Sequence, residues 1–197
     1  NPKINAHNFT FYEKAIECAK KSEQKYLTNS STLPLEGIPV AIKDEEDIKG
    51  QPNTNGSLIL KDHIANRTMI DVERIVNSGA VIHCRTTTPE FSTTSFTHSK
   101  LWGVTRNPWN LDYTPGGSSG GSGASLAAGC STLATGSDIG GSIRIPASAC
   151  GLVGFKPPHG RNPQEAPFNH DQYCVVGPMA RTVKDCALMQ NVMSGPH

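Results

Sequence analysis

The sequence predicts an α/β fold with strands that pair at least partly in parallel. Short apolar runs bounded by turn-forming residues alternate with segments of helical periodicity, a pattern typical of such sheets. The chain has 197 residues, of which 36% are hydrophobic, so it is long enough to bury a real core. Residues 114–156 are rich in glycine and serine, yet apolar residues recur among them. A flexible linker would lack those apolar residues.

The first predicted elements are a helix over residues 9–27 and a strand over residues 37–43. In the helix, apolar residues fall near one face, with lysines and glutamates between them, and we expect that face to pack on the domain. The residues are Phe9, Tyr12, Ile16, Ala19 and Tyr26. The apolar run GIPVAIK is too short for a helix and is bounded by turn-forming residues, so it predicts a short buried strand that ends in Lys43. The acidic run 44–47 that follows is expected to be a solvated loop.

The middle of the chain predicts one helix–strand unit and a second helix start. Residues 71–78 have helical periodicity, and Gly79 suits the end of that helix. Residues 80–84 form the next predicted strand. Thr88 followed by Pro89 is typical of a capped helix start.

The glycine- and serine-rich segment and the C-terminal region supply the remaining predicted elements. We expect a short helix over residues 122–128, followed by strands over 132–135 and 152–155. Thr182 and Asp185 have capping-box spacing, so they predict the start of a last helix that runs to residue 193.

Composition excludes several function classes. The formal net charge is +1, which gives no reason to expect nucleic acid or an anionic membrane as a partner. No apolar run has the roughly 20 residues needed to span a bilayer. The six cysteines lack the paired spacing of a metal site, and we interpret them as small buried residues in a reducing, cytoplasmic compartment. Because the sequence starts with asparagine, we expect the natural N-terminus to lie outside it.

Two glycine-rich motifs present serines on sharp bends. The first is GGSSGG at residues 116–121, with Ser118 inside it, and the second is GSDIGGSIR at residues 136–144, with Ser142. Glycine permits tight turns and close approach of a ligand, so both hydroxyls can be unobstructed. We interpret Asp138 and Arg144 as an ion pair that braces the second motif. Three further serines are expected to be turn or hydrogen-bonding residues: Ser119, Ser122 and Ser137.

From about residue 35 onward the sequence resembles the amidase signature family of hydrolases. The motifs that carry the resemblance agree in order and spacing. They are GIPVAIKD (37–44), SGAVI (78–82), TPEF (88–91), NPWN (107–110), PGGSSGGS (115–122), GSDIGGSIRIPA (136–147), CGLVGFKP (150–157) and GPMARTV (177–183).

The resemblance implies a mixed β-sheet core surrounded by helices. Because family members are much longer, we expect this chain to hold only the N-terminal part of that fold. It would comprise an N-terminal helical segment, 1–34, and an incomplete signature core, 35–197. The resemblance implies no metal and no cofactor. The implied partner is a small-molecule amide; a homo-oligomer and pairing with a C-terminal half both stay open.

The resemblance also implies a set of site residues. Lys43 matches the family's catalytic lysine, Ser118 the bridging serine, which follows a cis peptide bond, and Ser142 the nucleophile. The backbone amides of residues 139–142 match the oxyanion hole; these residues are Ile139, Gly140, Gly141 and Ser142. Ser92 falls near a substrate-binding position.

The implied chemistry is hydrolysis of a carboxamide C–N bond through a serine acyl-enzyme. A serine hydroxyl becomes a strong nucleophile only when a base removes its proton. Lys43 can be that base only when neutral, and burial at the end of an apolar strand disfavours the ammonium form. The acids after Lys43 would oppose this, so we expect the lysine to point inward and the acids outward. Ser118 suits a proton relay, because a hydroxyl both donates and accepts.

Two alternatives stay open at this point. The family also contains amidotransferase-type subunits that act in a complex. Separately, Gly116-x-Ser118-x-Gly120 satisfies the nucleophile-elbow pattern of α/β-hydrolase esterases. That pattern requires an acid and then a histidine downstream, for which Asp185 and His197 are the available pair.

Overall fold

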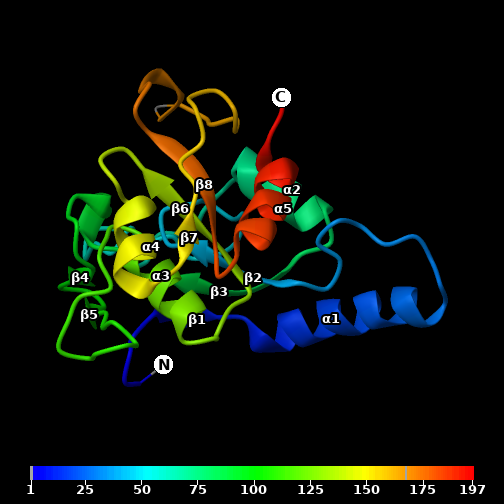
Figure 1. Cartoon of the computed structure of the whole chain (residues 1–197), viewed down its shortest axis with the longest axis horizontal. Helices are drawn as coiled ribbons and strands as arrows, with labels where there is room; N and C mark the ends of the chain where they lie inside the picture. Colours follow the sequence, from blue (N-terminus) through cyan, green and yellow to red (C-terminus); the bar gives the residue numbers. More distant parts are fainter. Residues whose placement is uncertain (1, 167) are drawn as a thin grey trace.

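A computed structural model describes residues 2–166 and 168–197 of the chain. Within them, six strands form one sheet in the order β1-β3-β2-β6-β8-β7 (Figure 1). β2 pairs in parallel with both β3 and β6, whereas the other pairs are antiparallel. The predicted mixed sheet is therefore confirmed. The strands are β1 (His7–Thr10), β2 (Pro39–Lys43), β3 (Val81–Thr86), β6 (Leu133–Asp138), β7 (Val153–Gly154) and β8 (Val175–Ala180).

Helices cover both faces of this sheet. Apolar side chains of α2 and α5 pack on one face together with β2 and β8, and those of α3 and α4 pack on the other. The helices are α1 (Tyr12–Leu27), α2 (Ile70–Asn77), α3 (Gly120–Ala127), α4 (Arg144–Cys150) and α5 (Val183–Met193). A small hairpin, β4 (His98–Ser99) and β5 (Gly103–Val104), lies apart from the sheet. Among the described residues, every helix falls short of the length and apolar content that crossing a bilayer requires.

The first helix begins later than the sequence predicts, and its apolar face is not the buried one. Phe9 belongs to β1, which pairs with β3 and leaves the helix to start at Tyr12. Tyr12, Ile16 and Tyr26 are each more than half exposed. The helix instead turns small residues inward, and Ser22 donates a 2.6 Å hydrogen bond to the buried Glu36. The prediction of the buried face was therefore wrong, and Figure 1 shows α1 extending away from the sheet.

The other predicted elements agree with the structure to different degrees. The helix predicted over 71–78 is α2, and the one predicted from Thr182 is α5, whose first turn is capped by the Thr182 hydroxyl. The start predicted at Thr88 gives only a 3₁₀ turn at Glu90–Ser92. The sequence did not predict α4 or β8, because a proline interrupts the local pattern of each.

The prediction that all six cysteines are buried was also wrong in part. Cys84, Cys150 and Cys186 are buried, but Cys130 is exposed and two others are half-buried. All six are free thiols.

Candidate active site

Lys43 is the last residue of β2, in the middle of the sheet. Because β2 and β6 run in parallel, their carboxyl ends meet at the same edge. The Lys43 backbone is held on both sides there: its N–H donates to the Thr135 hydroxyl at 3.0 Å, and its carbonyl accepts from Arg85 at 3.1 Å. The side chain is fully buried, so the predicted inward direction of the lysine is confirmed.

The Lys43 amine contacts three oxygen atoms. Its Nζ lies 2.7 Å from Ser118 Oγ, 2.8 Å from Ser137 Oγ and 3.1 Å from Glu45 Oε2. The sequence predicts the first contact through the family resemblance. Ser137 was expected to be a hydrogen-bonding residue, and its partner here is the lysine itself.

Ser118 reaches the lysine from the turn that leads into α3. The Gly117–Ser118 peptide bond is cis, as the resemblance implies, and Ser118 is fully buried. The first turn of α3, just after Ser118, lies very close to the end of β3: a Cβ built on Gly121 would be 2.4 Å from the backbone nitrogen of Thr87. Only glycine fits there, so this residue lets the turn deliver Ser118 to the strand end.

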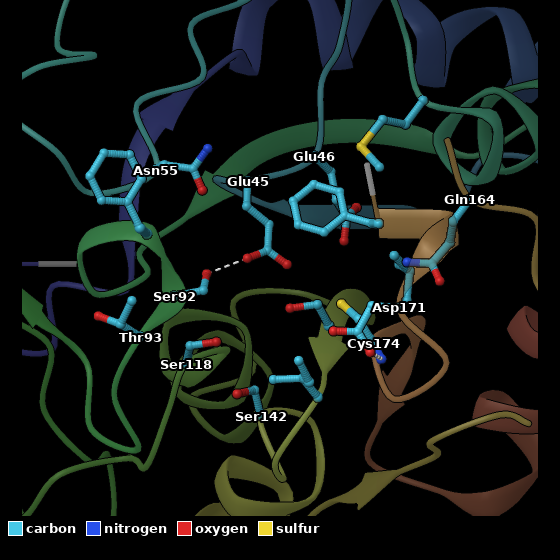
Figure 2. Close-up of a pocket in the computed structure, with 16 residues that line it drawn as sticks. Glu45, Glu46, Asn55, Ser92, Thr93, Ser118, Ser142, Gln164, Asp171 and Cys174 are labelled. Carbon is cyan, nitrogen blue, oxygen red and sulfur yellow. Dashed lines mark hydrogen bonds between the residues drawn. The ribbon is translucent and has the colours of Figure 1, made fainter. Parts of the chain in front are cut away.

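Ser142 lies in the turn between β6 and α4, on the same cavity as Ser118. Its carbonyl accepts from the amide of Ser119 at 3.2 Å, which ties the two glycine-rich turns together. Both hydroxyls line a cavity of about 540 Å³ (Figure 2), a size suited to a small organic substrate. The half-buried Ser142 is the more accessible of the two serines.

Asp138 organises the turn that carries Ser142. Its buried carboxylate accepts from the guanidinium of Arg144 at 2.9 and 3.0 Å, so the predicted ion pair is confirmed. It also accepts from the amides of Gly141 at 2.8 Å and Ile143 at 3.2 Å. Burial by itself would raise the pKa of Asp138, but the hydrogen bonds from Arg144 and from the backbone outweigh it and lower that pKa.

The backbone amides of the predicted oxyanion hole differ in their partners in this structure. The Gly141 amide donates to Asp138 at 2.8 Å. In the described part of the chain, the amides of Ile139, Gly140 and Ser142 donate to no protein acceptor. Ile139 lines the cavity, and a Cβ on Gly140 would meet no atom within 4 Å.

The acidic loop after Lys43 is not solvated, contrary to the sequence prediction. Asp44 and Glu46 are fully buried. Asp44 is held by Asn8 at 2.6 Å and by the amide of Thr54 at 3.0 Å. Glu45 turns towards Lys43 instead of outward. The prediction failed because segments remote in sequence cover the loop that follows the strand, and a local pattern does not show them.

Ser92 also lines this cavity. Figure 2 shows its hydrogen bond to Glu45, in which the Ser92 hydroxyl donates. Ser92 also pairs with the hydroxyl of Thr88 at 3.0 Å. Its φ of +56° and that of Phe91, +51°, are unusual for residues other than glycine. The structure therefore places Ser92 on the same cavity as the two other predicted serines.

Comparison with known proteins finds a family match over the whole chain. The Amidase family model matches residues 1–197. A glutamyl-tRNA(Gln) amidotransferase subunit from Brachyspira hyodysenteriae is 44% identical, over 98% of this chain and 40% of that relative. Indoleacetamide hydrolase from Bradyrhizobium diazoefficiens is 39% identical, over 98% of this chain and 38% of that relative.

A solved structure shows the same architecture. A bacterial aryl acylamidase, described as a member of the amidase signature enzymes family, superimposes with a TM-score of 0.92 at 34% identity. The match covers 100% of this chain and 41% of that chain. The sequence therefore spans about two fifths of the length of the relatives it matches.

Proposed function

The chain belongs to the amidase family, whose signature motifs it carries, and on that premise we propose that it forms the catalytic part of a hydrolase that cleaves linear carboxamides. The observation that carries the proposal is the 2.7 Å contact between Lys43 Nζ and Ser118 Oγ, beside a cavity that Ser118 shares with Ser142. Nucleophile, relay and base are thus supplied by three segments distant in sequence.

The proposed reaction begins when Ser142 Oγ attacks the amide carbonyl carbon. Its proton passes to Ser118 Oγ, and Ser118 passes its own proton to neutral Lys43. The negative charge on the carbonyl oxygen is stabilised by the free amides next to Ser142, an effect whose removal typically costs about 10²–10³ in rate. Ile139, Gly140 and Ser142 supply these amides.

The second half of the reaction frees the serine. The tetrahedral intermediate collapses, the C–N bond breaks, and the amine leaves with the proton returned from Lys43 through Ser118. Water then attacks the ester on Ser142 and loses its proton along the same path to Lys43. The bond between Ser142 Oγ and the acyl carbon breaks, the proton returns through Ser118 to Ser142 Oγ, and the carboxylic acid leaves. Ser92, which lines the same cavity, is proposed to contact the substrate.

The test uses the full-length protein with an aryl amide such as a p-nitroanilide. Ser142→Ala should lower kcat/KM at least about a thousandfold, because removing a nucleophilic serine disables the whole catalytic unit. The matched control is Ser148→Ala, an exposed serine on α4, which should retain wild-type activity. Full activity in Ser142→Ala would refute the proposal. Mass spectrometry of a trapped acyl-enzyme should locate the acyl group on Ser142.

A second candidate function is that of one chain in an amidotransferase-type complex. The similarity to a glutamyl-tRNA(Gln) amidotransferase subunit supports it. Hydrolysis of simple aryl amides by the purified protein alone favours the hydrolase, whereas activity that appears only with further chains favours the amidotransferase. The elbow-type esterase has no support: Ser118 contacts a lysine, and no histidine is among the described residues that line the cavity.

The proposed setting is the cytoplasm. The six free thiols suit a reducing compartment.

A further inference from the structure

Glu45 is the feature of this cavity that the proposed reaction does not use. It lies two residues after Lys43, yet its carboxylate turns back towards the Lys43 amine, at 3.1 Å. Its side chain is 15% exposed, and it lines the cavity together with Ser118 and Ser142. The Ser92 hydroxyl donates a hydrogen bond to it (Figure 2). A hydrogen-bonded carboxylate thus lies directly against the proposed base.

The oxygens around the Lys43 amine suit two protonation states. An ammonium group has three donors and can donate to Ser118, Ser137 and Glu45 together. A neutral amine has two N–H donors and one lone pair. If the N–H groups point at Glu45 and Ser137, the lone pair faces Ser118 Oγ, 2.7 Å away. Glu45 therefore orients the neutral amine for the proton that Ser118 delivers.

The negative charge of Glu45, by contrast, opposes the formation of the neutral amine. An anion 3.1 Å from the amine stabilises the ammonium form, which cannot accept a proton. Burial alone would raise the pKa of Glu45, but the charge of Lys43 and hydrogen bonds from Ser137 and Ser92 outweigh it and lower that pKa. Glu45 is accordingly ionised at neutral pH.

Among the described residues, Glu45 is the one whose carboxylate lies within 4 Å of the Lys43 amine. Burial raises the pKa of Glu46, in the same loop, well above its ordinary value, and raises that of Asp71, on α2, to about 7. Burial also raises the pKa of the Cys174 thiol, which precedes β8. Arg85, on β3, adds a positive charge, and it donates to the Lys43 carbonyl. The anion that faces the lysine is therefore Glu45.

We propose that Glu45 is a positioning residue that orients the Lys43 amine towards Ser118 while stabilising its ammonium form in the resting enzyme. The inference rests on the proposed function. It assigns this amidase an activity that rises with pH, because the neutral amine forms only when the Lys43–Glu45 pair loses its proton.

The experiment measures kcat/KM of the full-length protein against pH for three variants. Glu45→Gln keeps an oxygen acceptor but removes the charge. The acidic limb of the pH profile, where kcat/KM rises with pH, should therefore move to lower pH by about 1–3 units, the usual effect of a close opposite charge. Glu45→Asp keeps the charge and shortens the reach, so the limb should stay near its wild-type position while the plateau falls. Glu45→Ala should show both effects, an acidic limb at lower pH and a lower plateau of kcat/KM.

The control is Glu73→Gln, which removes an exposed carboxylate on α2 and should leave the limb in place. Thermal melting of each variant shows whether it is folded. An unmoved limb in Glu45→Gln, with Ser142→Ala inactive, overturns this inference and leaves the proposed function standing. Full activity in Ser142→Ala overturns both.

Discussion

Asp138 binds Arg144 through both carboxylate oxygens, with Oδ1 2.9 Å from Nη2 and Oδ2 3.0 Å from Nε. The carboxylate is fully buried, while the Arg144 side chain is 53% exposed. The same two oxygens also accept from the amides of Gly141 and Ile143. Ser142 lies between these two residues, so the ion pair sets the conformation of the turn that presents the proposed nucleophile.

Asp138→Ala is expected to destabilise the protein and to reduce activity. The substitution leaves buried amide donors without their acceptor, at a cost of about 1–3 kcal/mol in the free energy of unfolding. Urea denaturation measures that loss, and aryl amide hydrolysis measures the effect on Ser142. Arg144→Ala should cost less, because its guanidinium is half exposed while the backbone donors keep their acceptor. Equal stability of wild type and Asp138→Ala would show that the turn holds without this carboxylate.

The stabilising effect of Asp138 should depend on pH. Its pKa is lowered in the folded protein, so its contribution is fully present above the unfolded value of about 3.9. The contribution is lost as the pH falls through the lower folded value. The difference in unfolding free energy between wild type and Asp138→Asn should therefore be constant from pH 7 to about 5 and shrink below about pH 4. A difference that grows in acid would contradict this assignment.

Lys43→Ala should lower kcat about 10²–10⁴-fold, the usual contribution of a general base. Lys43→Arg should be similarly impaired, because a guanidinium stays protonated at every accessible pH. The pair of variants separates a proton acceptor from a mere positive charge. Near wild-type turnover in Lys43→Arg would exclude the lysine as the base. Circular dichroism checks that both variants fold, since each alters a buried position.

Gly121→Ala is expected to destabilise the fold by at least about 1–3 kcal/mol, as overpacking does. The added methyl group would lie 2.4 Å from the Thr87 nitrogen and 2.5 Å from its carbonyl oxygen. Backbone atoms cannot yield as a flexible side chain can, so α3 must shift and take Ser118 with it. Thermal melting measures the loss. Gly140→Ala is the matched control for stability, because its Cβ would enter open space; a larger loss in Gly140→Ala would contradict the argument.

Local sequence patterns predicted much of the scaffold. The apolar run before Lys43 became the central strand β2, and the capping pair Thr182 and Asp185 became the start of α5. Periodicity failed at the first helix, because it cannot tell an apolar stripe that packs inward from one left exposed. It also missed β8, where Gly177 and Pro178 interrupt the apolar pattern of a strand whose pairing with β6 is set by tertiary contacts.

The sequence was enough to predict the candidate site residues, since the motifs around Lys43, Ser118 and Ser142 are local and specific. Only the tertiary structure decided that Glu45 faces the lysine and that the Gly141 amide is engaged by Asp138. The physical reason is that the direction of a side chain beyond a strand end depends on how the following loop is packed. That packing is made by Asn8, Thr54 and Ser92, which no spacing rule connects to residue 45.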